Sequence, residues 1–175
     1  MKKIIFLGKS DNIINFLQNQ GYKVTNFTEK ITLQDFQQIM PLHTISYGYQ
    51  HIITEDILKE YKIINLHISY LPYNRGANPN FWSFFDNTPK GVTIHFMDKG
   101  IDTGNIIFQK KIKFSFNEFT LSTTYHRLKK EIEALFISQW KNIETKNYNQ
   151  KTQNLLSGSY YCQKDFNKFT NHLPN

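Results

Sequence analysis

An amide, an imidazole and a carboxylate are spaced along the middle of the chain so that a sheet could bring them together. Asn65 and His67 alternate with apolar residues in the run INLHI, so both side chains project from one face if this run is a strand. Asp102 follows the next apolar run, GVTIHF, in a segment that is typical of a loop. Amide and imidazole donors can stabilise an oxyanion, and a carboxylate can accept a proton. The pattern predicts a site for acyl transfer at one end of a sheet.

Two other chemistries use the same residues. Together with His95, the group could form a metal site, but an amide is a poor ligand for transition metals and no His-x-x-x-His spacing is present. Ser69 could complete a Ser-His-Asp hydrolase with His67 and Asp102, but it lies in no Gly-x-Ser-x-Gly elbow. The plain structural alternative is that His67 is a core histidine and Asp102 closes a turn. We favour acyl transfer without a metal, and we expect His95 to support the site structurally.

The composition fits one domain, and its positive charge fits a small phosphate-bearing substrate at least as well as a nucleic acid, or simply a solvated lysine surface. The chain has 175 residues, 39% of them hydrophobic, which is enough for one core. Its net charge of +7 is spread along the chain: 12 basic and 9 acidic residues precede Lys113, and 9 and 5 stand from there on. Nucleic-acid binders usually concentrate their basic residues, so we expect no nucleic-acid partner. We also expect no membrane association and a cytoplasmic location, because no apolar run is as long as a span and no signal peptide is present. The single cysteine, Cys162, excludes an internal disulfide.

Alternating strand and helix patterns predict an α/β fold with a Rossmann-like, mostly parallel twisted sheet flanked by helices. The loop GKSD after the first strand lacks the Gly-x-Gly-x-x-Gly pattern of dinucleotide-binding proteins. We expect residues 1–150 to form one catalytic domain, and 151–175 to form a tail that packs on it or extends it. The expected strands are Lys2–Leu7, Lys23–Phe27, Thr44–Gly48, Ile63–Ile68, Val92–Met97 and Ile106–Ile112. The expected helices follow caps at Ser10 and Thr54, cover Ile31–Met40, open at Pro79, and run from Thr120 to about Thr145.

A family resemblance rests on ordered motifs between residues 65 and 104. Asn-x-His, Leu-Pro-x-x-x-Gly, Gly-Val-Thr-x-His and Asp-x-Gly follow one another as in the formyltransferases that use N10-formyltetrahydrofolate. The segments SYGYQHII and NRGANPNFWS resemble the sugar N-formyltransferase branch. The resemblance implies the formyltransferase catalytic-domain fold, N10-formyltetrahydrofolate as co-substrate, and Asn65, His67 and Asp102 as catalytic residues. It also implies cofactor contacts from Gln50, His51, Ile52, Asp98, Lys99, Gly100 and Ile101.

The acceptor that this branch implies is a dTDP- or UDP-linked amino-deoxysugar, modified for lipopolysaccharide or another surface glycan. Arg75 lies within the motifs, where a rigid guanidinium could hold a phosphate or a carboxylate. The other implied acceptor contacts are Asn78, Trp82, Tyr160 and Lys164, although Trp82 by itself fits a helix core slightly better. Tyr161 stands where the sugar branch has a histidine, so we assign it no role. The Tyr- and Phe-rich second half makes a homodimer an expectation as well.

Several alternatives stay open. Glycinamide ribonucleotide as acceptor would require a glycine-rich phosphate loop after the first strand, and GKSD offers one glycine. A tRNA acceptor would require an added domain, for which we see no room. A catalytically idle, metabolite-binding module is the alternative from another functional class. In the mechanism that the family implies, Asp102 raises the pKa of His67 and holds it cationic, so that His67 and Asn65 stabilise the oxyanion and Asp102 accepts the amine proton.

Overall fold

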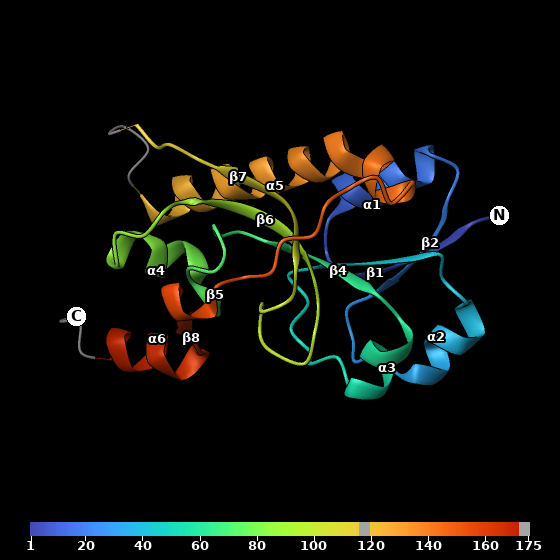
Figure 1. Cartoon of the computed structure of the whole chain (residues 1–175), viewed down its shortest axis with the longest axis horizontal. Helices are drawn as coiled ribbons and strands as arrows, with labels where there is room; N and C mark the ends of the chain where they lie inside the picture. Colours follow the sequence, from blue (N-terminus) through green and yellow to red (C-terminus); the bar gives the residue numbers. More distant parts are fainter. Residues whose placement is uncertain (116–119, 172–175) are drawn as a thin grey trace.

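A six-stranded sheet forms the centre of the computed structural model, which describes residues 1–115 and 120–171 (Figure 1). The strand order is β2-β1-β3-β4-β6-β7, and the first four strands are parallel. Strand β6 is antiparallel to β4, and β7 is antiparallel to β6. The expectation of a mostly parallel sheet is therefore confirmed. The strands are β1 (Lys3–Gly8), β2 (Lys23–Phe27), β3 (His43–Tyr47), β4 (Ile63–His67), β6 (Gly91–Phe96) and β7 (Ile106–Lys111).

Helices cover both faces of the sheet, as Figure 1 shows. On one face lie α1 (Asp11–Asn19) and α5 (Leu121–Glu144), and on the other lie α2 (Leu33–Ile39) and α3 (Glu55–Glu60). Alternate residues of the buried strand β1 join the two cores. Ile4 and Phe6 pack in the cluster that includes α1 and α5, whereas Ile5 and Leu7 pack with α2 and α3. A strand that is covered on both faces reads as a continuous apolar run, as this one does.

Caps set the ends of the helices. The hydroxyl of Ser10 accepts a hydrogen bond from the Ile13 amide at the start of α1, as expected. Thr32 and Thr120 form capping boxes with the third residues of α2 and α5. Because Thr32 is the cap, α2 begins two residues later than the expected start at Ile31, which packs in the core instead.

Two segments that are far apart in the sequence, 75–85 and 160–170, form a second, smaller unit of structure. Strand β5 (Arg75–Gly76) pairs in parallel with β8 (Tyr160–Tyr161), beside α4 (Pro79–Phe85) and α6 (Gln163–Thr170). A 3-10 turn, η2 (Leu155–Ser157), precedes β8. Upstream of that turn, Lys151 bridges to Ile106 of the main sheet. The expected tail, 151–175, contacts the domain through these pairings, and its last four residues lie outside the described residues.

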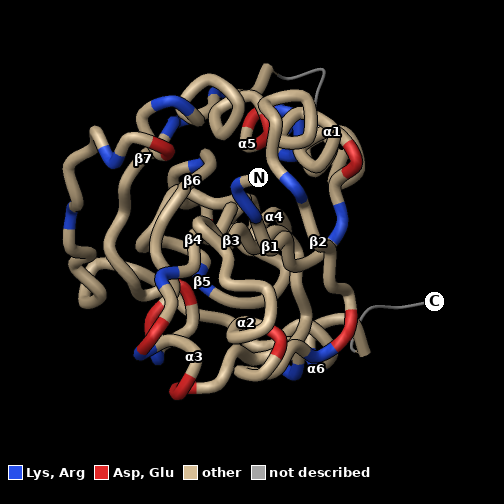
Figure 2. Tube along the Cα trace, turned by 90° about the vertical axis from the view of Figure 1, so that its right-hand side faces the viewer, with Lys and Arg blue, Asp and Glu red and all other residues tan. Residues whose placement is uncertain are grey.

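Charges of both signs are distributed over the trace. Figure 2 shows basic and acidic residues near α1 and α5 on one side of the sheet and near α2, α3 and α6 on the other. Among the described residues, no helix combines the length and the apolar character that crossing a membrane requires.

Candidate functional site

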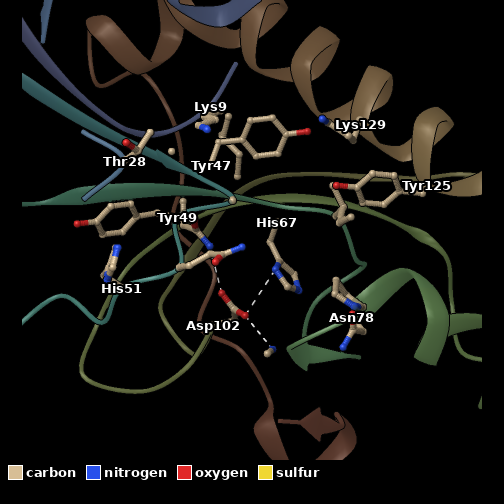
Figure 3. A pocket seen from close by; sticks show the side chains of 18 of the residues that line it. Lys9, Thr28, Tyr47, Tyr49, His51, His67, Asn78, Asp102, Tyr125 and Lys129 are labelled. Carbon is tan, nitrogen blue, oxygen red and sulfur yellow. Dashed lines mark hydrogen bonds and ion pairs between the residues drawn. The ribbon is translucent and has the colours of Figure 1, made fainter. Parts of the chain in front are cut away.

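A cavity of about 760 Å³ opens where the carboxyl ends of β1, β3 and β4 meet (Figure 3). Gly8, Tyr47 and His67, the last residues of these strands, all line it. Because the three strands are parallel neighbours, their carboxyl ends lie at one edge of the sheet. Open α/β sheets bind ligands at this edge. The cavity therefore lies at an end of the sheet, where the spacing of Asn65 and His67 predicts the site.

The Asp102 carboxylate joins the three expected catalytic residues. Its Oδ1 accepts a hydrogen bond from Asn65 Nδ2 at 3.1 Å, and its Oδ2 lies 3.5 Å from His67 Nδ1. The amide N–H of Gly76 donates to the same Oδ2 at 2.9 Å. Figure 3 shows these contacts converging on Asp102 at the wall of the cavity. The structure thus brings together an amide and an imidazole from β4 and a carboxylate from the loop before β7.

His95 holds Asn65 from below the cavity. Its Nδ1 lies 2.8 Å from the Phe96 carbonyl oxygen, and its Nε2 lies 3.1 Å from Asn65 Nδ2. A carbonyl only accepts, so Nδ1 carries the hydrogen and Nε2 accepts from the Asn65 amide. Both Asn65 amide hydrogens then have partners, Asp102 and His95. This fixes the plane of the amide, which is the supporting role expected for His95.

His67 is a buried imidazole between two acceptors. Its Nε2 donates to the Asn74 carbonyl oxygen at 3.1 Å, while Nδ1 faces Asp102. Burial lowers the pKa of His67 more than the Asp102 carboxylate and the Asn74 carbonyl raise it, and nearby His95 lowers it further. The expectation that Asp102 holds His67 cationic is therefore wrong. The strand that buries this ring makes it neutral near pH 7.

Asp102 itself is ionised. Burial alone would raise the pKa of its carboxyl, but the adjacent imidazoles of His67 and His95 and the Gly76 N–H outweigh burial and hold this pKa well below its usual range. The residue also adopts φ 53°, in the left-handed region. A carboxylate that stays charged in a mostly buried site is suited to accept a proton from a reacting amine.

The competing chemistries find little support in the geometry. The hydroxyl of Ser69 donates to the Tyr73 carbonyl at 2.7 Å, and the residue is almost fully buried. It is therefore committed to a backbone acceptor and does not serve His67 as a nucleophile. Within residues 1–115 and 120–171, no group of three His, Cys, Asp or Glu side chains is close enough to hold a metal ion.

The predicted cofactor contacts divide into two sets. Gln50 and His51 line the cavity, and the His51 ring lies 5.3 Å from that of Tyr49. These flat aromatic groups fit a heteroaromatic ring such as a pterin. Ile52 is 78% exposed and lies outside the lining. The loop residues Asp98, Lys99, Gly100 and Ile101 lie outside it too, on the segment that leads to Asp102, and their contacts stay predictions.

Among the predicted acceptor contacts, Asn78 lines the cavity. Arg75 is half-buried on β5, outside the lining. The Trp82 ring is buried and stacks on Tyr161, with ring centroids 3.9 Å apart and planes 9° apart. Such a stack is core packing, the interpretation that the sequence slightly favoured for Trp82. The roles of Arg75 and Trp82 in binding stay predictions, as do those of the exposed Tyr160 and Lys164.

Helix α5 supplies lining residues that the sequence did not predict. Tyr125 and Lys129, four residues apart, share one face of the helix and project into the cavity (Figure 3). The Lys129 Nζ lies 5.7 Å from the Tyr125 ring centroid and 6.0 Å from that of Tyr47. This i,i+4 spacing is visible in the sequence, but α5 was expected only to cover the sheet. Further lining residues that were not predicted are Lys9, Thr28, Tyr47 and Tyr49.

A family model described as formyl transferase matches residues 8–139, which carry the cavity and all three residues of the Asp102 cluster. The chain belongs to the formyl transferase family. Among solved structures, it resembles the formyltransferase PseJ from Anoxybacillus kamchatkensis, in complex with UDP-4,6-dideoxy-4-formamido-L-AltNAc and tetrahydrofolate. The identity is 39%, the TM-score is 0.90, and the match covers 100% of this chain and 93% of that one. The N-formyltransferase from Helicobacter canadensis, in complex with folinic acid and dTDP-3-aminofucose, matches at 25% identity and TM-score 0.80, over 100% and 75% of the two chains.

Curated relatives of this formyl transferase family member are methionyl-tRNA formyltransferases. That of Caldanaerobacter subterraneus subsp. tengcongensis is 37% identical over 83 residues, which are 46% of this chain and 27% of the relative. That of Sulfurimonas denitrificans is 33% identical over 137 residues, 78% of this chain and 44% of the relative. The chain thus spans less than half the length of these curated relatives. The family and fold expected from the motifs are confirmed, and the two groups of relatives differ in their acceptor.

Proposed function

We propose that this protein transfers the formyl group of N10-formyltetrahydrofolate to the C4 amine of a UDP-linked 4-amino-4,6-dideoxysugar. The observation that carries the proposal is the cluster of Asp102, Asn65 and His67 at the cavity edge. The likeness to PseJ over nearly the whole of both chains supports the choice of acceptor. The use of the product in lipopolysaccharide or another surface glycan stays a prediction, and so does a homodimer.

The three residues divide the chemistry between them. Asn65 and His67 stabilise the negative charge that develops on the formyl oxygen, as the sugar nitrogen bonds to the formyl carbon, by turning toward it N–H groups that now contact Asp102, His95 and the Asn74 carbonyl. One such donor typically lowers a barrier by roughly 3 kcal/mol. Asp102, being ionised, accepts the proton that the amine loses. The bond from the formyl carbon to N10 then breaks, and the leaving nitrogen takes up one proton, so the transfer is balanced in charge and atoms.

The acceptor's diphosphate requires cations at the cavity. Among the described residues that line it, Lys9 and Lys129 carry positive charge. Lys9 follows β1 and Lys129 projects from α5, so the two face the same end of the cavity in Figure 3. We place the diphosphate there, and the folate ring near Tyr49 and His51. This placement moves the principal phosphate contact from Arg75, where the sequence had put it, to lysines.

Methionyl-tRNA is a second candidate acceptor, favoured by the 33% identity over 137 residues to the Sulfurimonas denitrificans enzyme. A tRNA contact usually requires a concentrated basic surface. Here both charge signs are distributed around the molecule (Figure 2), which favours the small acceptor.

The proposal is tested with a panel of acceptors. N10-formyltetrahydrofolate is supplied with a UDP-linked 4-amino-4,6-dideoxysugar, a dTDP-linked 3-amino sugar or methionyl-tRNA, and release of tetrahydrofolate is followed. We expect turnover with the UDP-sugar at the highest kcat/KM. Turnover with methionyl-tRNA alone would establish the second candidate. Folate binding without turnover of any amine would show an idle binding module.

A further inference from the structure

Gln153, from the segment after α5, reaches the backbone of the catalytic loop. Its Nε2 donates to the carbonyl oxygens of Asp102 at 3.0 Å and of Gly104 at 2.7 Å. The residue is 8% exposed, so these hydrogen bonds are shielded from water. It lies beyond residues 8–139, the part of the chain that the family model matches. The Asp102 cluster described above does not include it.

The chemistry of the primary amide fits this position. An amide nitrogen has two hydrogens, and here each meets a carbonyl that can only accept. A flipped amide would place Oε1 against those two oxygens, so the orientation is fixed. Oε1 itself is buried and has no hydrogen-bond partner among the described residues. Leaving a buried acceptor unpaired is costly. The side chain keeps this orientation because its two N–H groups pair with the two carbonyls.

Gln153 and the cavity wall hold opposite ends of Asp102. The carboxylate is held by Gly76 N–H and Asn65, whereas the carbonyl is held by Gln153. Between the two anchors, Asp102 adopts φ 53°, a conformation that non-glycine residues visit only when their surroundings impose it. The Gln153 backbone is fixed in turn, because Lys151 exchanges two hydrogen bonds with Ile106 of the main sheet, at 2.9 and 2.8 Å.

We propose that Gln153 is a positioning residue, which sets the direction of the Asp102 carboxylate toward the reacting amine by fixing the loop backbone. The proposal rests on the proposed function, since it assigns Asp102 the proton-accepting role. Gln153 does not touch substrate. Its effect should therefore appear in kcat and in the titration of Asp102 more than in the binding of either substrate.

The first test compares Gln153→Met, which keeps the length and removes both donors, with Gln150→Ala. Gln150 also contacts the loop, through an exposed bond from Asn105 at 3.3 Å, but does not reach Asp102. We expect Gln153→Met to lower kcat by roughly 10- to 100-fold, because misplacing a catalytic group by about 1 Å costs on that order. KM for both substrates and folate affinity should stay within about twofold, and Gln150→Ala should match the wild type. The milder Gln153→Asn, which keeps the amide but is too short, should fall between them.

The second test reads the carboxylate directly and does not depend on turnover. The Asp102 carboxyl is titrated by NMR in protein labelled with ¹³C-aspartate and assigned with Asp102→Asn. The titratable groups that face it are His67 and His95. If Gln153→Met turns the carboxylate away from Gly76 N–H and Asn65, the pKa of Asp102 rises. Activity that falls only with the folded fraction, or a titration equal to that of the wild type, would overturn the proposal. A wild type inactive on every amine would overturn the proposed function instead, and the titration would still decide the role of Gln153.

Discussion

His67 is a neutral donor in this site, and that changes how the oxyanion is stabilised. The imidazole donates to Asn74 through Nε2, and burial keeps its pKa below the ordinary value. Asp102, whose pKa is held low, remains the ionised base from the start. The charge of the pair therefore resides on the carboxylate before the amine attacks.

The neutral state of His67 predicts a particular dependence of stability on pH. The unfolded histidine takes up a proton near pH 6.5, roughly its unperturbed pKa, whereas the folded one does not until a lower pH. The His67 contribution is thus complete above that value and is lost as the pH falls toward the folded pKa. We expect the unfolding free energy of wild type minus that of His67→Gln to decrease between about pH 7.5 and pH 5.

Urea unfolding over this pH range measures that difference. His126→Gln, which changes an exposed histidine on α5, is the control. If the wild-type advantage instead increased on acidification, the folded pKa of His67 would lie above its unfolded value. Asp102 would then hold the ring cationic after all.

The proposed position of the acceptor's diphosphate depends on Lys129. Lys129→Gln removes a cation at the cavity, and a charge-assisted hydrogen bond contributes about 1.5–3 kcal/mol. We therefore expect the acceptor KM to rise roughly 10-fold or more, with folate affinity unchanged. Lys130→Gln, its exposed neighbour outside the lining, is the matched control in two-substrate kinetics. A change confined to the folate constant would place the diphosphate elsewhere, and Arg75→Lys would then be the variant to measure.

That Asn65, His67 and Asp102 come together could be predicted from the sequence, but their charge states could not. Strand alternation places Asn65 and His67 on one face whatever surrounds them, and the loop motif adds Asp102. The pKa of His67 depends on how deeply β4 is buried, which is a property of the assembled sheet. Gln153 carries no local pattern either, because its partners, the carbonyls of Asp102 and Gly104, are backbone atoms some 50 positions away.

At the scale of elements, a two-residue pairing connects the C-terminal segment to the site. The Arg75 amide donates to the Ser159 carbonyl, and the Ala77 amide donates to that of Tyr161. Between them, Gly76 donates to Asp102, so β8 holds the strand that helps to hold the Asp102 carboxylate. The side chain of Tyr161 locks β8 against α4, through the stack on Trp82 and a hydrogen bond to Asp86 at 2.7 Å.

Tyr161→Phe isolates that hydrogen bond while keeping the stack. Burial and the Asp86 carboxylate raise the pKa of Tyr161 to about 12, so the hydroxyl is a donor throughout the physiological range. A hydrogen bond to a charged group contributes roughly 1.5–3 kcal/mol, less where it is partly exposed, and we expect a loss of about 1–2 kcal/mol in unfolding free energy. Urea denaturation measures it, with Tyr160→Phe, half-exposed on the same strand, as control. Equal stability of wild type and Tyr161→Phe would mean that stacking alone holds β8.

The main elements follow from local patterns, whereas the small sheet does not. Apolar periodicity, with a cap at Ser10 for α1, places the two large helices within one or two residues. Strands β5 and β8 are too short to show a period, and their register joins residues 85 positions apart. Helix α6 follows Cys162, whose capping box with Asp165 is detectable in the sequence only if cysteine is accepted as a cap.

At the scale of the whole molecule, the parallel half of the sheet positions the site. Its strand ends form one wall of the cavity, α5 forms another, and the loop before β7 contributes Asp102. The C-terminal segment then fixes that loop from behind through Gln153 and β8. In the proposed function, the folate lies near Tyr49 and the acceptor near Lys129, in one cavity that the Asp102 carboxylate also lines.

The most direct test of this account is mass spectrometry of the sugar nucleotide. Purified protein is incubated with N10-formyltetrahydrofolate and a UDP-linked 4-amino-4,6-dideoxysugar, in parallel with Asp102→Asn and with Asp56→Asn, an exposed carboxylate on α3. The account predicts that wild type and Asp56→Asn add one formyl group to the sugar amine, and that Asp102→Asn binds folate but forms product at least roughly 100-fold more slowly. An unmodified sugar with wild type, or undiminished product with Asp102→Asn, would contradict it.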